Sequence, residues 1–353
     1  MTANRKPRST PHDRELRLWK VGRALTLAFA AAILVAGGIF YALVALLDFK
    51  EIDSTAKLDA KTLFDLVKLS FGVVAGAGAL VALVVAYRRQ RVDEAGAHRE
   101  ATRLHTERFS QAVDKLGSDS PAVRLGGVHA LAGLADDAPT QDLRQTCIDV
   151  LCAYLQLPFG PGPGQSAHQE EQHRYLALRK VRHTILRLIG DHYRRPLGTH
   201  RSWQGCSLDL TEVAIDGDLD FGGATFSGGG HVYFDNATFS GSYVSFYQVT
   251  FSGSVVSFEN ARFSGGRVSF SDTTFSGGHV HFDNARFSGG RVSFSGTTFS
   301  GGHVHFDNAT FSGSRVSFDN AMFSGGVTSF DGATISGGMV SFDRASGTVP
   351  SIQ

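Results

Sequence analysis

Residues 231–350 repeat a twelve-residue phrase without a gap. The first two copies read HVYFDNATFSGS and YVSFYQVTFSGS. Valine recurs every twelve residues, two positions before a phenylalanine, and forms a column of equivalent positions. Thr328 interrupts this column. Self-similarity with a short fixed period is typical of a solenoid, in which each repeat buries its apolar face against its neighbours. The repeat therefore constrains the fold more strongly than any local pattern in the chain.

The phrase has the composition of short β-strands joined by tight turns. Val-x-Phe places two apolar side chains on one face of a strand, because side chains alternate with a period of two. Ser-Gly-Gly and Asp-Asn-Ala supply turns, since glycine accepts positive φ and Asn or Asp bonds its own backbone. A helical solenoid would need sustained apolar spacings of three and four, which the phrase lacks. We therefore expect a β-solenoid with a core of stacked phenylalanines: Phe234, Phe239, Phe246, Phe251, Phe258, Phe263, Phe270, Phe275, Phe282, Phe287, Phe294, Phe299, Phe306, Phe311, Phe318, Phe323, Phe330 and Phe342.

Columns of residues that lie two phrases apart indicate the length of one coil. Acidic residues recur with that step, whereas the positions halfway between them are mixed; the acidic column is Asp235, Glu259, Asp283, Asp307 and Asp331. A coil of one phrase would be too tight to enclose two phenylalanines and a valine. We therefore predict four-sided coils of about 24 residues, within the range of known solenoid repeats. The ten phrases then make five coils. A recent duplication of a segment of two phrases would leave the same columns.

The N-terminal quarter of the chain has the pattern of a membrane hairpin. Residues 1–23 form a basic tail, and two uncharged apolar runs follow at 24–47 and 69–87. Each run has about the length that crosses a bilayer. The segment between them, 48–68, carries four lysines and five acidic residues, while basic clusters lie outside the hairpin. The positive-inside rule then predicts a multi-pass plasma-membrane protein with an external loop at 48–68 and with both termini in the cytoplasm.

Two further domains are expected after the hairpin. Residues 88–200 show helical spacing of apolar residues, with a helix start at Ser120-Pro121, and residues 201–353 form the solenoid. The three cysteines do not make a disulfide framework, which fits a reducing compartment. Residues 203–353 contain six arginines, no lysine and thirteen acidic residues, a net charge of −7.

Two stretches of the chain resemble a known family. Ala237-Thr238-Phe239-Ser240-Gly241 and its copies resemble the pentapeptide-repeat proteins. The segment RFSQAVDKLGSDSPAVRLGGVHALAGLADD resembles the helical region of membrane-anchored actinobacterial members, and SWQGCSLDLTEVAIDGDLDF resembles the start of their solenoid. The resemblance implies a right-handed quadrilateral β-helix without a cofactor. Each phrase here is a pentad followed by seven further positions, which departs from strict pentads.

The side chains that could carry chemistry repeat from coil to coil. A catalytic site needs a unique constellation in a pocket, so we expect no enzyme activity, no catalytic residues and no cofactor. His279 and His281 flank an inward valine and therefore point outward, and His303 and His305 lie one coil further on. Four imidazoles on one face could bind Zn²⁺ or Ni²⁺. We expect a solvated, duplicated ladder instead, with metal binding as an alternative, and we assign the acidic column to turns.

The favoured function is a non-catalytic scaffold or protein-interaction module that is anchored to the membrane lipid bilayer and binds an unknown cytoplasmic protein. Some pentapeptide-repeat proteins resemble DNA in shape and charge and bind gyrase, so a DNA-mimicking regulator of a topoisomerase or another DNA-binding protein is the alternative. The arginine column formed by Arg267, Arg291 and Arg315 makes this a weak imitation of DNA. Direct nucleic-acid binding is not expected. A homodimer through the C-terminal coil would cover the unpaired backbone groups at that end.

Overall fold

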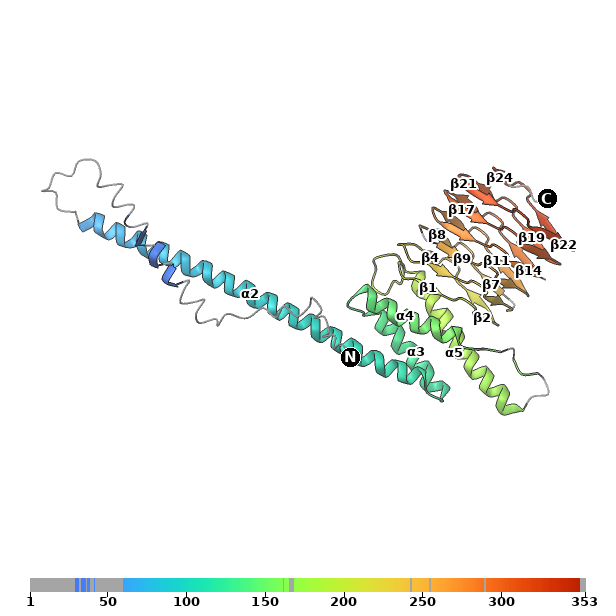
Figure 1. Ribbon diagram of the computed structural model, residues 1–353, viewed down its shortest axis with the longest axis horizontal. Helices are drawn as coiled ribbons and strands as arrows, with labels where there is room; N and C mark the ends of the chain where they lie inside the picture. The colour runs from blue at the N-terminus through green and yellow to red at the C-terminus, as the bar shows by residue number, and fades with distance from the viewer. Residues whose placement is uncertain are drawn as a thin grey trace, which may run out of the picture. The chain divides into compact units, whose positions relative to one another are not determined.

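The computed structural model describes residues 60–349 except 161, 165–167, 242, 254 and 289, together with 29–31, 33–35, 37, 38 and 41. The chain divides into two compact units, residues 1–98 and residues 99–353. Figure 1 shows the second unit as a group of helices beside a stack of short strands.

The first unit is helical wherever it is described. Helix α2 (Ala60–Leu116) begins inside the segment predicted as an external loop and runs past the predicted domain boundary at residue 88. Its apolar side chains include Leu80 and Leu83, which are 65% and 66% exposed. In the described part of the chain, no helix has an apolar stretch long enough to cross a membrane. The predicted transmembrane hairpin is therefore not supported, and most of its first run, 24–47, lies outside the described residues.

Three helices of the second unit form a collar before the solenoid. They are α3 (Pro121–Asp136), α4 (Gln141–Gln156) and α5 (Gln169–Tyr193). Helix α3 starts as the sequence indicates, with Ser120 in extended conformation before Pro121. Gly127 permits α3 to approach the last turns of α2, because a Cβ there would lie 2.6 Å from the backbone nitrogen of Leu116. Fully buried Leu131, Leu151 and Ile185 join the helices into one core.

The solenoid consists of four parallel sheets with six strands each. Sheet A holds β1 (Leu208–Asp209), β5 (Val232–Tyr233), β9 (Val255–Ser257), β13 (His279–His281), β17 (Gly302–His305) and β21 (Gly326–Ser329). Sheet B holds β2 (Ala214–Ile215), β6 (Thr238–Phe239), β10 (Arg262–Phe263), β14 (Arg286–Ser288), β18 (Thr310–Ser312) and β22 (Thr334–Ser336). Sheet C holds β3 (Leu219–Asp220), β7 (Tyr243–Ser245), β11 (Arg267–Ser269), β15 (Arg291–Ser293), β19 (Arg315–Ser317) and β23 (Met339–Ser341). Sheet D holds β4 (Thr225–Phe226), β8 (Thr250–Ser252), β12 (Thr274–Ser276), β16 (Thr298–Ser300), β20 (Met322–Phe323) and β24 (Ser346–Gly347).

The strand register confirms the predicted length of one coil and its four sides. Phe263 pairs with Phe287 in sheet B, and Val268 pairs with Val292 in sheet C. The six strands of each sheet make about six turns of a right-handed-type β-solenoid, because a first coil precedes the five that the strict repeat predicts. Leu219 pairs with Val244, one residue beyond the regular step of two phrases. The first coil therefore departs by one residue from the regular step that the later coils keep.

The phenylalanines fill the inside of the coils as the sequence predicts. Phe282 stacks on Phe258 and Phe306 with ring centroids 4.8 and 4.7 Å apart and planes within 2° of parallel. It also meets Phe294 of the facing column edge to face, at 5.8 Å and 89°. Such aromatic pairs contribute about 0.5–1.5 kcal/mol each beyond the burial of area. All eighteen predicted core phenylalanines are buried except Phe342, which is half-buried in the last coil.

The turns between sheets A and B explain the residues that follow the acidic column. Asn236, Asn260, Asn284 and Asn308 adopt φ between 56° and 58°. Asparagine tolerates this left-handed conformation better than most residues with a side chain. A buried alanine follows each of these asparagines, and the same corner recurs in each of these coils.

Side chains of α4 and α5 cover the strand edges at the N-terminal end of the solenoid. Their amide and guanidinium groups donate hydrogen bonds of 2.8–3.2 Å to backbone carbonyls of the first coil: Gln145 to Ser207, Gln156 to Asp209, Arg182 to Ala214 and Arg194 to Asp220. An unpaired sheet edge is a site of aggregation unless something covers it. The collar therefore provides hydrogen-bond donors to β1, β2 and β3 that a preceding coil would otherwise provide.

A half-buried carboxylate, that of Asp136, connects the collar to the start of the solenoid. Trp203 is fully buried and stacks on His192 with ring centroids 4.1 Å apart, and its indole nitrogen donates to Asp136. Burial raises the pKa of Asp136, but hydrogen bonds from His192 and Trp203 and the charges of His192 and Arg195 outweigh it. The pKa of Asp136 therefore lies below its ordinary value, and the carboxylate is ionised at neutral pH.

Substitution of a central phenylalanine tests the contribution of the aromatic stack. Phe282→Ala should lower the free energy of unfolding by about 3–5 kcal/mol, because the cavity lies between two coils that cannot collapse onto it. Phe342→Ala is the matched control in the half-buried last coil and should cost clearly less. Denaturant titration followed by far-UV circular dichroism measures both. Equal losses would contradict the dependence of the fold on the central stack.

Candidate functional site

The four histidines of the predicted ladder lie together on the outer surface of sheet A. The rings of His279 and His303 stack with centroids 5.0 Å apart, and those of His281 and His305 with centroids 5.5 Å apart. The valines between them are buried, so the predicted outward direction is correct. His279 and His303 are exposed, whereas His281 and His305 are half-buried. The ladder thus consists of an outer and an inner column.

The inner histidines contact the acidic column rather than solvent alone. The Nδ1 atom of His281 lies 3.1 Å from Oδ2 of Asp283, and Nδ1 of His305 lies 3.5 Å from Oδ2 of Asp307. These carboxylates stand at the corner between sheets A and B. The acidic residues are therefore not turn residues alone, because they also face the imidazoles.

A repeated serine–carboxylate contact holds several aspartates of the solenoid, among them Asp307. A serine of the next coil donates a hydrogen bond to the acidic residue: Ser257 to Asp235, Ser329 to Asp307 and Ser341 to Asp319. The hydrogen bond from Ser341 holds the pKa of Asp319 below its ordinary value, despite partial desolvation. We call these residues the ladder serines. Each of them holds one oxygen, Oδ1, of its carboxylate.

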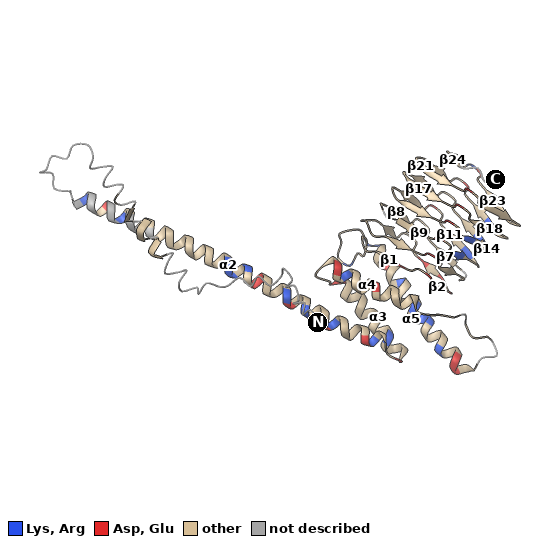
Figure 2. Ribbon diagram, in the orientation of Figure 1, with Lys and Arg blue, Asp and Glu red and all other residues tan. Residues whose placement is uncertain are grey.

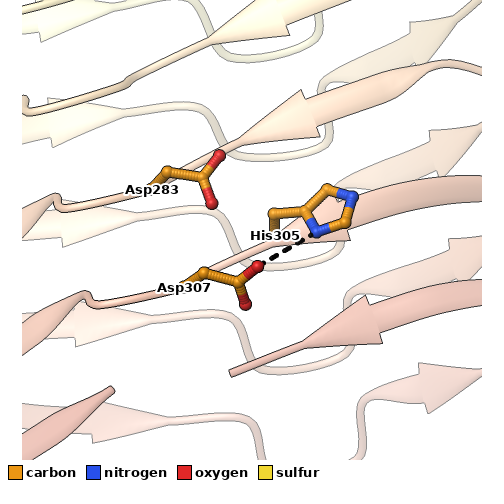
Figure 3. Close-up of side chains that lie close together, drawn as sticks. All are labelled: Asp283, His305 and Asp307. Carbon is orange, nitrogen blue, oxygen red and sulfur yellow. Dashed lines mark ion pairs between the residues drawn. The ribbon is translucent and has the colours of Figure 1, made fainter. Parts of the chain in front are cut away.

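Histidine replaces the ladder serine above Asp283. His305 follows Asp283 by the same number of positions as Ser329 follows Asp307, and it contacts Asp307 of its own coil. One donor atom from each of Asp283, His305 and Asp307 lies within 4.8 Å of the other two, and all three side chains are half-buried. Figure 3 shows them projecting into a common space from two neighbouring coils. A nitrogen and two carboxylate oxygens in this arrangement can bind a cation. We call this group the His305 cluster.

A second surface is formed by arginines around the corner between sheets B and C. Arg267, Arg291 and Arg315 pair in register on sheet C and, with Tyr243, Gly266 and Gly290, line a shallow hollow of about 640 Å³. The glycines leave the corner without side chains; a Cβ on Gly290 would lie 1.9 Å from the carbonyl oxygen of Gly266. Figure 2 shows basic residues on strands such as β11 and β14 of this surface. We call this hollow the arginine groove.

The charge of the arginine groove is not neutralised by the described residues. Arg262 and Arg286 flank it on sheet B, and they are exposed like the three arginines of the groove. Within the described part of the chain, none of these five arginines makes a side-chain hydrogen bond or an ion pair. Two unit charges one strand apart, about 4.8 Å, repel by about 1 kcal/mol even in water. An anionic ligand would relieve this repulsion.

The fold and its surfaces define a class: a parallel β-solenoid that presents ladders of identical side chains on four flat faces. A family model described as pentapeptide repeats, with nine copies, matches residues 234–283. The remaining coils continue the register of this matched segment. Comparison with curated proteins and with solved structures returned no match.

Part of each surface is visible in the sequence. The arginine column on sheet C was visible from its regular step of two phrases, whereas the contribution of Arg262 and Arg286 was missed, although they are separated by the same step. The four histidines were identified as a possible metal site, but Asp283 and Asp307 were assigned only to turns. One feature of the sequence could have revealed the role of these two aspartates: His305 occupies a position at which other coils have a serine.

Proposed function

We propose that this chain is a non-catalytic scaffold whose solenoid binds an acidic segment of a cytoplasmic protein through the arginine groove. The observation that carries the proposal is the column of three exposed arginines at the spacing of one coil, to which no described residue forms an ion pair. Charge-assisted hydrogen bonds from guanidinium to carboxylate are among the stronger polar contacts in proteins. The fold fixes the backbone positions of these donors, so that only the side chains need to be ordered on binding.

Binding fits this surface better than catalysis does. Catalysis requires a nucleophile or base, an orienting group and a pocket that brings them to one reacting atom. The polar side chains of the solenoid instead repeat along its length, as the pairing of Arg267 with Arg291 and of His279 with His303 shows. A periodic surface favours an extended partner that makes the same contact several times.

The surrounding charge favours a short acidic protein segment over nucleic acid. The solenoid region, residues 203–353, has a net charge of −7, and five of its six arginines gather at this one groove and its flank. Duplex DNA carries one negative charge per about 1.7 Å, so the acidic remainder of the solenoid would repel it. A segment with a few carboxylates needs only the three coils that hold the groove.

Reversal of one groove charge tests this proposal. Arg291→Glu should weaken the binding of a fluorescent deca-glutamate peptide to the full-length protein at least tenfold, because it removes the central donor and adds a repulsive charge. Arg344→Glu makes the same charge change at an exposed position outside the groove and should change the affinity less than twofold. Fluorescence anisotropy at low and physiological salt measures both.

Two outcomes of that titration would contradict the proposal. Equal losses in both variants would mean that only the net charge matters, and tighter binding of a short DNA duplex than of the peptide would make the groove a nucleic-acid site. A photo-reactive residue at position 315 then identifies the cellular partner by cross-linking. Capture of a topoisomerase there would favour the DNA-mimic alternative.

We propose in addition that the chain forms a homodimer through its last coil. Strands β21 to β24 leave one edge of each sheet unpaired by any described residue. Val327, Ile335 and Met339, which belong to this coil, are 51%, 42% and 59% exposed. The opposite end is covered by α4 and α5, so the contrast between the two ends supports an association at the exposed one.

Engineered disulfides test the dimer. Thr348→Cys places a thiol at the last coil and should yield a disulfide-linked dimer on mild oxidation, measured by non-reducing electrophoresis. Ser264→Cys, exposed at a corner in the middle of the solenoid, is the matched control and should stay monomeric. The native thiols are buried, and burial raises the pKa of Cys147 and Cys152 to about 12, so they should not react. Cross-links in both variants, or in neither, would argue against this dimer.

Attachment to the plasma membrane, with both termini cytoplasmic, is a proposal from the apolar runs 24–47 and 69–87 and from the resemblance to membrane-anchored members. The exposed apolar side chains of α2 near Leu83 agree with a partner that is itself apolar.

The full-length protein should stay in the pellet when membranes are extracted with alkaline carbonate. A chain that begins at Arg88 should appear in the supernatant. Release of the full-length protein by carbonate would refute the anchor.

A further inference from the structure

We propose that Asp283, His305 and Asp307 bind one divalent transition-metal ion between two neighbouring coils of the solenoid. The site joins the end of β13 to the end of β17 (Figure 3). It goes beyond the proposed protein-binding function and lies on a different surface from the arginine groove. It also differs from the predicted ladder of four histidines, because two carboxylates and one imidazole provide the donors.

The replacement of one ladder serine creates the space and the donor. At Asp235, Asp307 and Asp319 a serine of the next coil occupies one carboxylate oxygen. At Asp283 the corresponding residue is His305, and among the described residues no ladder serine reaches this carboxylate. The imidazole of His305 instead stands between Asp283 and Asp307. His281 holds the same position after Glu259, but among the described residues it is at His305 that a nitrogen and two carboxylates of successive coils lie within 4.8 Å of one another.

The surrounding hydrogen bonds orient one ligand of the cluster. Ser329 and the backbone amide of Asp331 both donate to Oδ1 of Asp307, at 2.5 and 3.0 Å. The other oxygen, Oδ2, is therefore directed to Nδ1 of His305, 3.5 Å away. Donors that hold the outer oxygen of a ligating carboxylate are a regular feature of metal sites. The site is thus partly preorganised before an ion enters.

The distances need only small changes to accommodate an ion. Ligand atoms about 2.0–2.2 Å from a shared ion lie at most about 4.4 Å from each other. The donor atoms of the His305 cluster lie within 4.8 Å of one another, so a small rotation of a half-buried side chain completes the set. Water fills the remaining positions on the solvent side. His281, whose Nδ1 lies 3.1 Å from Asp283, can hold that carboxylate in place.

The donor types select the class of ion. One imidazole nitrogen with two carboxylate oxygens suits Zn²⁺, Ni²⁺, Co²⁺ or Mn²⁺, whereas Mg²⁺ and Ca²⁺ prefer oxygen ligands alone. The ion would also neutralise two carboxylates that stack one coil apart. It would connect two coils through side chains, in addition to the backbone hydrogen bonds between the strands. Binding should therefore raise the thermal stability of the solenoid.

Isothermal titration of the full-length, tag-free protein with Zn²⁺ tests the proposal. The wild type should bind one ion that Mg²⁺ does not displace, and the midpoint of thermal unfolding should rise. His305→Ser should weaken binding at least tenfold without loss of folding, because serine occupies this position at Ser257 and Ser329. Asp283→Asn should have a similar effect. His303→Ser, on the same strand but outside the His305 cluster, is the control and should bind as the wild type does.

The alternative outcomes are distinct. Unchanged Zn²⁺ binding in His305→Ser, or no binding by the wild type, would overturn the site. Loss of binding in His303→Ser as large as in His305→Ser would assign the ion to the four-histidine ladder instead. Since the arginine groove is intact in all of these variants, deca-glutamate binding should not change, which separates this test from that of the proposed function.

Discussion

The pairing of each strand with the strand one coil later is the constraint on which the rest of the solenoid depends. Because the step between paired residues is constant through the regular coils, every side chain lies above its own copy at the spacing of neighbouring strands. Inside, this spacing matches the distance at which aromatic rings stack, as in the 4.7 Å contact of Phe282 with Phe306. Outside, it forces like charges into columns. The same register thus stabilises the core and produces the charged surfaces.

The two ends of the solenoid differ in whether their strand edges are covered. At the N-terminal end, glutamine and arginine side chains of α4 and α5 bond the carbonyls that a further coil would have bonded. Trp203 and Asp136 fix those helices in place through buried contacts. At the other end, the described residues leave strands β21 to β24 without such partners. The collar is therefore part of the solenoid's stability, and the last coil is the place where another molecule has most to contribute.

Function in such a fold comes from extended repetition or from a local exception to it. The arginine groove is of the first kind, because Arg267, Arg291 and Arg315 offer one contact three times. The His305 cluster is of the second kind, because a histidine stands where the following coil places Ser329, which holds a carboxylate. Catalysis would require several exceptions that converge on one pocket. These surfaces favour binding for that reason.

The sequence by itself determined the period, the four sides, the inward phenylalanines and the outward histidines, since each follows from alternation and spacing along the chain. It did not reveal that α2 begins at Ala60 within the segment read as a loop, because charged residues are compatible with either state. Tertiary structure alone decided which columns meet. Arg262 and Arg267 belong to different sheets and share a surface because a glycine corner joins them. Asp283 and His305 stand almost one full coil apart in the chain and meet because the coil closes on itself, a proximity in space that no local pattern encodes.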